Sequence, residues 1–208
     1  MKIIIAVTSF VILKLAFAEY PPDITKCLDL EDYNGFDSAK FLKGNWYVTH
    51  ARYGSNSTVC REYKPRLRKN GTVLIVEDGY YSFGDSPRYY RVRCRGNKEN
   101  EKGKISLKCK QQSRGRENKI IFYFQLGLTV VETDYDKFAV LYRCAVSLNT
   151  TIPFIEDNLL ILHRKEGDEY SMVKTLLQNY GSSLEEFLAR KDSECLPSPV
   201  KILKKGNV

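Results

Sequence analysis

The sequence predicts an all-β fold, in which eight antiparallel strands form an up-and-down barrel and C-terminal helices pack against its outside. From Lys43 onward, apolar residues recur at every second position and are mostly β-branched or aromatic, as in half-buried strands. Gly, Pro, Asn and Asp separate the alternating segments, and after Arg164 the period becomes that of a helix. Eight antiparallel strands are enough to enclose one small ligand.

The chain begins with a segment typical of a secretion signal. Residues 1–18 combine a basic start, an apolar run and a small-x-small ending at Ala16 and Ala18. We therefore expect a cleaved signal peptide over residues 1–18, one domain over residues 19–195 and a basic tail over residues 196–208. An internal anchor helix is the alternative reading, but the stretch is short and contains Lys14, so no membrane span is expected.

The predicted strands follow one another with short connections. No repeat or low-complexity linker divides them, so they belong to one domain. Their approximate boundaries are 44–54, 58–67, 71–83, 87–95, 103–111, 119–131, 137–147 and 156–164.

Two helices are expected after the last strand. The first places its apolar residues on one face, and Gly181 is positioned to end it. These apolar residues are Tyr170, Val173, Leu176, Leu177 and Tyr180. Ser182 or Ser183, with a glutamate three residues later, forms a capping box that opens a second short helix with Leu184, Phe187 and Leu188 facing inward. We expect the pair to pack on the outside of the barrel and assign it no chemistry.

Six cysteines in a secreted chain predict three disulfides. If strands 87–95 and 103–111 form a hairpin, the numbers of opposed residues sum to about 203, which pairs Cys94 with Cys109 at a distance that a disulfide spans. Spacing leaves the partners of the other cysteines open: Cys27, Cys60, Cys144 and Cys195.

Glycosylation and metal binding can also be judged from short patterns. Sequons begin at Asn56, Asn70 and Asn149, in agreement with secretion. The chain has two histidines and no C-x-x-C spacing, so a metal site has little support. No cofactor is expected.

Positive charge is concentrated in one part of the chain. The formal net charge is +8, yet residues 88–119 alone hold twelve Lys or Arg against three Glu. Such a cluster attracts polyanions and acidic protein patches, and its effect weakens with salt. The alternative is a solvated face that keeps the protein soluble, and nucleic acid is poorly supported because export removes the protein from most such partners. The candidate anion-binding or partner-binding residues are Arg88, Arg91, Arg93, Arg95, Lys104, Lys108 and Lys110.

Three motifs resemble those of the lipocalins. GNW at 44–46 resembles their G-x-W signature, TDY at 133–135 resembles the segment before their seventh strand, and Arg164 stands where their closing arginine follows the eighth. A closed barrel needs a plug at one end, and an indole with a guanidinium stacked on its face can supply it. We therefore expect Trp46 and Arg164 to be structural residues of the barrel floor.

A closer resemblance covers nearly the whole chain. YVTH at 47–50, VCREYK at 59–64 and LYRC at 141–144 are similar to the salivary lipocalins of blood-feeding triatomine bugs, the triabin, pallidipin and triplatin group of the calycin superfamily. This resemblance implies the disulfides Cys27–Cys144 and Cys60–Cys195. The Lys-rich tail past Cys195 departs from the shorter members.

The resemblance also implies a choice between two functions. Some members of the group trap platelet agonists such as thromboxane and ADP, and others bind host clotting proteins, including thrombin and the contact-activation factors. Related haem carriers, the nitrophorins, use a histidine in the region that here runs from Cys60 to Phe83. This chain has no histidine there, so haem is not expected.

Another set of candidate residues belongs to the barrel interior. Alternation places Trp46, Val48 and His50 on one face of the first strand, with His50 roughly 13 Å above the indole plug. A histidine there suits an anionic or hydroxylated ligand, and the alternative is a core histidine bonded to a tyrosine or a carbonyl. For five aromatic residues the alternation leaves open which face of the strand they occupy, and half of them should face outward. They are Tyr80, Phe122, Tyr123, Phe124 and Tyr142. The ligand-binding set is His50, Val48, Tyr142 and Phe124.

No residues suggest a catalytic centre. His50 and His163 lie on separate predicted strands, and neither a G-x-S-x-G motif nor a free thiol is in view. We expect a monomeric, secreted, non-enzymatic lipocalin of saliva that inhibits host haemostasis. The basic segment favours binding of clotting or contact-activation factors and a block of coagulation at anionic surfaces. The alternative is capture of an eicosanoid, ADP or a biogenic amine in the barrel, which would inhibit platelet aggregation.

Overall fold

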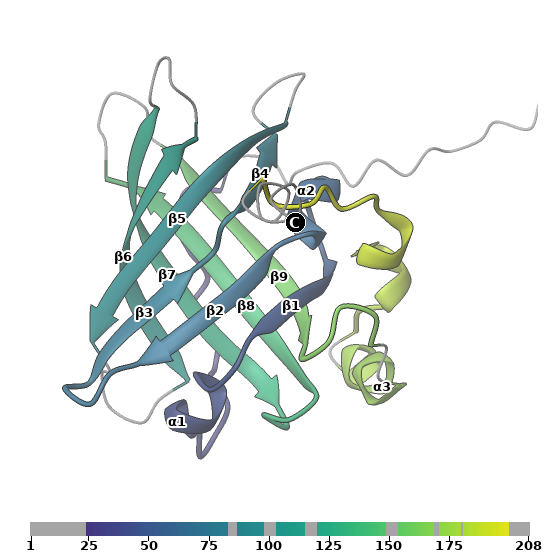
Figure 1. Cartoon of the computed structure of the whole chain (residues 1–208). Coiled ribbons are helices and arrows are strands. Elements are labelled where there is room, and N and C mark those ends of the chain that lie inside the picture. The colour runs from purple at the N-terminus through teal and green to yellow at the C-terminus, as the bar shows by residue number, and fades with distance from the viewer. Residues whose placement is uncertain are drawn as a thin grey trace, which may run out of the picture.

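The fold was analysed in a computed structural model of the chain, shown in Figure 1. The structure describes residues 24–82, 87–97, 103–114, 120–148, 154–168, 171–179 and 181–199. The expected signal peptide, the sequon at Asn149 and most of the basic tail lie outside these residues.

Eight antiparallel strands close into a barrel, which confirms the predicted fold class. Hydrogen bonding runs in the order β1-β2-β3-β5-β6-β7-β8-β9, and β9 pairs back with β1. The strands are β1 (Trp46–Ala51), β2 (Glu62–Leu67), β3 (Thr72–Val76), β5 (Pro87–Asn97), β6 (Lys104–Ser113), β7 (Ile121–Thr133), β8 (Phe138–Ser147) and β9 (Ile155–His163).

The strand predicted over residues 71–83 is two strands in one line. β3 and β4 (Gly79–Ser82) pair with β5 in the same register and are interrupted at Glu77 and Asp78. The Asp78 carboxylate accepts a hydrogen bond from the Val92 amide at this break. The strand predicted over residues 58–67 begins later, at Glu62, because residues Asn56–Val59 form the helical turn α2. This turn lies at the end of the barrel opposite the helical turn α1 (Ser38–Phe41) (Figure 1).

Burial patterns distinguish the two sides of the barrel wall. Along β6, buried and exposed residues alternate strictly, as expected where one face packs on the core and the other meets water. Along β8 the first eight residues are all buried, because the inner face lines the core and the outer face is covered. The wall is therefore solvated on the β5–β6 side and covered on the β8–β9 side.

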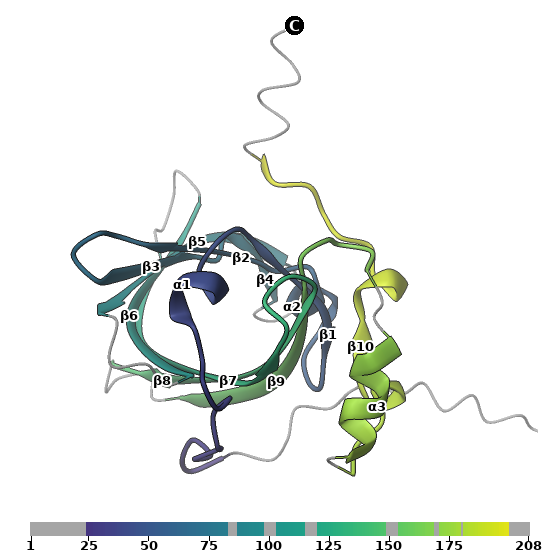
Figure 2. The same cartoon turned by 90° about the horizontal axis from the view of Figure 1, so that it is seen from below.

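The floor of the barrel is built around Trp46, as predicted. The indole is 1% exposed and donates its Nε1 hydrogen to the Phe41 carbonyl of α1 (Ser38–Phe41), which lies across the lower end of the barrel in Figure 2. The Arg164 guanidinium lies 3.4 Å from the centre of the indole ring and donates to the backbone carbonyls of Tyr135, Asn45 and Lys40. Both residues thus have structural roles at the closed end.

A helix and an extended segment cover the outside of β1, β8 and β9. In α3 (Ser171–Asn179), Val173 and Leu177 pack on an outer cluster with Phe138, Val140 and Ile161, which confirms that C-terminal structure lies outside the barrel. The predicted second helix is wrong in extent. It consists of one 3-10 turn, η1 (Leu184–Glu186), followed by the short strand β10 (Leu188–Ala189) and a second turn, η2 (Arg190–Asp192). β10 pairs with the half of β1 that β2 leaves free.

Three disulfides tie these elements together. They join Cys27 to Cys144, Cys60 to Cys195, and Cys94 to Cys109, the same pairs that the sequence and the resemblance predicted. Two of them link segments more than a hundred residues apart, at separations of 117 and 135. Closing such long loops removes entropy from the unfolded chain, which stabilises the fold.

Candidate functional site

The orientation predicted for His50 is wrong. A β-bulge between Val48 and His50 shifts the register against β9, so that Val48 stands opposite Leu162 and His50 stands opposite Ile161. Leu162 belongs to the inner core and Ile161 to the cluster under α3, and directly opposed residues share a face. His50 therefore lies on the outer side of the wall, where its Nδ1 contacts the hydroxyl of Thr49 at 3.2 Å.

Inside the barrel, a cavity of about 500 Å³ lies toward the end near α2. One side is aromatic, with Tyr81, Phe122, Phe124 and Phe154. Apart from Gly54 and Ala145, the remaining lining is polar and consists of Ser55, Ser57, Thr58, Arg61, Glu77, Gln111, Arg143 and Glu156. The cavity thus combines an apolar wall with several groups that can form hydrogen bonds.

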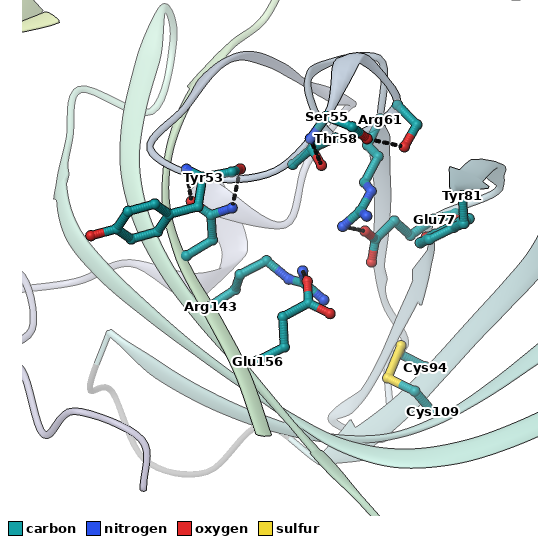
Figure 3. Close-up of polar contacts among 12 residues, drawn as sticks. Tyr53, Ser55, Thr58, Arg61, Glu77, Tyr81, Cys94, Cys109, Arg143 and Glu156 are labelled. Carbon is teal, nitrogen blue, oxygen red and sulfur yellow. Dashed lines mark hydrogen bonds and ion pairs between the residues drawn. A yellow bond between two sulfur atoms is a disulfide. The ribbon is translucent and has the colours of Figure 1, made fainter. Parts of the chain in front are cut away.

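Two ion pairs stand in this cavity. Arg61 Nη1 lies 3.5 Å from Glu77 Oε1, and both side chains are almost fully buried. Arg143 Nη1 lies 3.1 Å from Glu156 Oε1, with Arg143 buried and Glu156 partly exposed. Figure 3 shows each arginine turned toward its carboxylate within the barrel. The Arg61 guanidinium also stacks 4.4 Å from the centre of the Tyr81 ring.

Strand alternation puts these charges inside. Glu77 follows Val73 and Ile75 at period two, and Arg143 stands between Leu141 and Ala145 on the inner face of β8. Sequence reasoning missed both, together with Arg61. The sequence does contain a signal for Glu77 and Arg143, because each is a charged residue at a position whose alternation matches the inward-facing residues of its strand. The fold must bury a charge at such a position.

Several polar atoms around the cavity have no hydrogen-bond partner in the described part of the chain. Hydrogen-bond donors predominate among them. Leaving aside Arg61 Nη1 and Glu77 Oε1, which face each other in the ion pair, they are Arg61 Nε, Arg143 Nε and Gln111 Nε2. An unsatisfied buried polar group costs about 1–3 kcal/mol, so these atoms are available to a bound molecule rich in acceptors.

The tyrosines of this interior keep their protons. Burial, reinforced by Glu77, raises the pKa of Tyr63 and that of Tyr81 above their usual range. For Arg143, burial lowers the pKa, but Tyr63, Glu156 and Glu77 outweigh it and the pKa is raised. At neutral pH the cavity therefore presents neutral hydroxyls and charged guanidinium groups.

The other predicted pocket residues divide between the two faces. Val48 and Phe124 point into the barrel core, and Phe124 lines the cavity. Tyr142 is wrongly assigned to the interior, because it stands opposite Leu159 on the outer face of β8. Its hydroxyl donates to Asp157 and accepts from the Leu28 amide.

Most of the predicted basic residues do share the outer face of β5 and β6. In the register of the two strands, Arg93 stands opposite Lys110, and Arg95 stands opposite Lys108. Arg66 of β2 continues the second row across Leu74 of β3, a contribution that sequence reasoning missed. We define the basic face as the exposed residues Arg66, Arg91, Arg93, Arg95, Lys104, Lys108 and Lys110.

Arg88 does not belong to this face. It has the parity of the buried residues Tyr90 and Val92 and stands opposite Tyr81, so it lies on the other side of β5, near its end.

Two members of the basic face have acidic neighbours among the described residues. Arg93 pairs with Asp78, and Lys104 pairs with Asp29.

Exposed apolar side chains border the basic face. Tyr123 is 51% exposed and stands opposite Lys110, whose ammonium lies 5.9 Å from the centre of its ring. Ile121, 40% exposed, stands opposite Gln112, the neighbour of Arg91. Leu148 is also exposed, and its amide bonds to the Tyr123 carbonyl. A tyrosine amid cations is the composition found at the centre of many protein interfaces.

Metal, membrane and glycosylation signals add little to the site. Among the described residues, no group of three or more His, Cys, Asp or Glu is arranged to hold a metal ion. No helix in the described ranges has the length and apolarity needed to cross a membrane. Of the sequons, Asn70 is exposed at a turn and Asn56 begins α2.

Comparisons with known proteins agree with this geometry. The triabin family model matches residues 17–175. Triafestin-1 of Triatoma infestans is 43% identical over 194 residues, which cover 92% of each chain.

Two solved structures are similar in fold. The tryptamine complex of the amine-binding protein of Rhodnius prolixus superposes with a TM-score of 0.63 at 17% identity, covering 88% of this chain and 95% of the other. LTBP1 bound to leukotriene C4 superposes with a TM-score of 0.52 at 26% identity, covering 80% and 92%.

Proposed function

Since the chain belongs to the triabin family, whose members are non-enzymatic lipocalin-like binding proteins, we propose that it is a secreted salivary inhibitor of host haemostasis. It acts by binding clotting or contact-activation proteins through the basic face and thereby blocks coagulation at anionic surfaces. The three disulfides and the apolar leader of residues 1–18 support an extracellular location.

The observation that carries this proposal is the pairing of like charges across β5 and β6. Arg93 and Lys110 are directly opposed, as are Arg95 and Lys108, and like charges in this position destabilise a sheet. Only the first of these two pairs has an acidic neighbour, Asp78, among the described residues. An acidic surface on a partner relieves the repulsion, and Tyr123 supplies apolar contact beside it.

A clotting assay tests this function. In plasma triggered with a negatively charged activator, the purified protein is expected to prolong the clotting time in proportion to its concentration. The delay is expected to shrink as salt is added, since attraction between exposed charges is screened over about 8–10 Å at physiological ionic strength. A delay that is unchanged by salt, or no delay at all, would contradict binding through the basic face.

A second function is supported by the barrel cavity. We infer that the interior takes a small mediator with an anionic group and an apolar body, such as an eicosanoid. Arg61 Nε, Arg143 Nε and Gln111 Nε2, which have no hydrogen-bond partner among the described residues, suit the anionic group, and the aromatic wall suits the body. The similarity to LTBP1, solved with leukotriene C4, supports this ligand class.

Calorimetry with a stable thromboxane mimic tests the cavity. Stoichiometric binding is expected, and Arg143→Met is expected to weaken it at least tenfold by removing a charged donor. The variant should remain folded, because the partner Glu156 is 34% exposed and stays hydrated. His50→Ala should bind as the wild type does, since His50 faces outward. Equal binding by wild type and Arg143→Met would sink the cavity proposal.

A further inference from the structure

A second cavity lies outside the barrel and is separate from the one described above. It has a volume of about 700 Å³ and lies against the outer surfaces of β7, β8 and β9. Residues 24–34 of the N-terminal segment form its other wall, and Leu177 of α3 and Ser182 close one side. In Figure 2 this segment, drawn in purple, runs outside the barrel wall before it passes below the floor to α1. We call this cavity the outer groove.

The N-terminal segment is fixed at several points, so the outer groove is a built feature. Cys27 is joined to Cys144 of β8, and the Leu28 amide donates to the Tyr142 hydroxyl. Further along, the Tyr33 amide donates to the Val130 carbonyl, and Asp32 accepts from the amide of Gly103. A side chain at residue 103 would meet the Asp32 Cβ at 3.0 Å, so this close approach requires the glycine.

A β-bulge supplies the groove with an acidic group. The register of β7 against β8 shifts between Val130 and Glu132, and as a result Glu132 stands opposite Val140 of the outer cluster. The preceding residue, Val131, also packs on that cluster. Without the bulge, the alternation of β7 would have turned Glu132 inward, on the face of Val130.

The surroundings of Glu132 are apolar. The groove around it is lined by Leu28, Leu30, Val131, Val140, Leu159 and Leu177. Burial raises the pKa of Glu132, and a hydrogen bond from the Thr133 backbone opposes this only in part. Among the described residues, Glu132 forms no ion pair.

Negative charges outnumber positive charges in the lining of the outer groove, and the excess lies at the end where Glu132 stands. Among the described residues that line it, the carboxylates are Glu31, Asp32, Glu132 and Asp157, and the cation is Arg52. Arg52 lies beside β9, the strand of Asp157, because its amide bonds to the Leu159 carbonyl. Glu132 stands opposite Val140 of β8, and Asp157 stands opposite Cys144 of the same strand. These two positions on β8 are four residues apart, which corresponds to roughly 13 Å along the strand. Lys104 pairs with Asp29 and lies near Asp32. The negative charge at this end that has no cation beside it among the described residues is therefore that of Glu132.

We propose that the outer groove binds a small amphiphilic amine, with its ammonium group at Glu132 and its apolar body against Leu28, Val140 and Leu159. A protonated amine supplies the missing countercharge, and its hydrocarbon part replaces water on apolar walls. An organic anion is disfavoured by the four carboxylates. This inference goes beyond the proposed function, because neither the basic face nor the barrel cavity takes part in it.

Titration calorimetry with n-octylamine on the full mature protein tests this proposal. Octylamine is expected to bind with one-to-one stoichiometry, whereas octanol and octanoate bind more weakly. Glu132→Gln keeps the shape of the side chain and removes its charge, and it should weaken octylamine binding at least tenfold. Thermal unfolding of each variant verifies that the fold is retained.

Two matched variants locate the amine. Asp157→Asn keeps the hydrogen bond from Tyr142 and lies on β9, the strand beside Arg52 and away from Glu132, so it should change octylamine affinity by less than threefold. Glu156→Gln, inside the barrel, should leave the affinity unchanged. Loss of binding in Glu156→Gln would move the amine into the barrel and overturn the proposal, as would wild-type affinity in Glu132→Gln or no binding of octylamine to the wild type.

Discussion

Reversing two charges on the basic face, with Arg95→Glu and Lys108→Glu together, is expected to reduce the anticoagulant potency about 100-fold or more. The two side chains are directly opposed on β5 and β6, so the double variant turns a paired positive site into a paired negative one. It removes two attractive contacts with an acidic partner and adds repulsion, and like charges brought together at an interface cost several kcal/mol. The measurement is the concentration of protein that doubles the activator-triggered clotting time.

The control carries the same change in net charge at a distant place. Lys43→Glu with Lys165→Glu alters exposed residues near the closed end and after β9, away from the basic face. This control is expected to keep its potency within about threefold, because exposed charges beyond a Debye length are largely screened. If both double variants lose potency equally, net charge and not the basic face determines inhibition.

Replacing Glu77 by glutamine is expected to lower the free energy of unfolding by about 3–5 kcal/mol. The change leaves the Arg61 guanidinium buried without its countercharge and close to a second buried cation, Arg143. Removing one member of a buried ion pair is costly, whereas removing both can be neutral. Urea unfolding, followed by the fluorescence of Trp46, the single tryptophan, measures the difference.

The double variant Arg61→Met/Glu77→Met provides the comparison. It should recover most of the stability that Glu77→Gln loses, since no unpaired charge remains in the barrel. A Glu77→Gln variant that is as stable as the wild type would mean that the Arg61–Glu77 pair is hydrated and that the cavity is not a dry polar site.

Much of the fold was readable from local patterns. The alternation of β6, the hairpin arithmetic of Cys94 and Cys109, and the positions of Trp46 and Arg164 each depend on one strand or one pair of strands. The alternation of apolar and polar residues shows which segments are strands. Where no bulge intervenes, it also shows which face of the strand each residue occupies.

One error arises where a bulge changes the register, and others arise where the parity of a residue within its strand is misjudged. Counting from Trp46 places His50 on the inner face, but the bulge after Val48 turns it outward. Its charge groups Arg88 with the odd-numbered arginines of β5, although its parity differs from theirs. A bulge leaves little trace in the alternation of one short strand, because the extra residue is visible only against its partner strand.

Other features were beyond reach because they depend on distant segments. The strand β10 forms because the pairing of β1 with β2 ends at Tyr47 and leaves an open edge, a fact that the capping box after Gly181 does not reveal. The outer groove requires the N-terminal segment to lie across β7, β8 and β9, as the disulfide Cys27–Cys144 arranges. Such juxtapositions come from the closed topology and not from any local pattern.

The central claim, that the basic face is the surface that meets the host protein, is tested most directly by lysine footprinting. The protein is acetylated briefly, alone and in complex with purified contact-activation factors, and the modification of each lysine is measured by mass spectrometry. Lys108 and Lys110 are expected to be strongly protected in the complex, while Lys43 and Lys165 react equally in both states. Unchanged reactivity of Lys108 and Lys110 in a stable complex would contradict the claim.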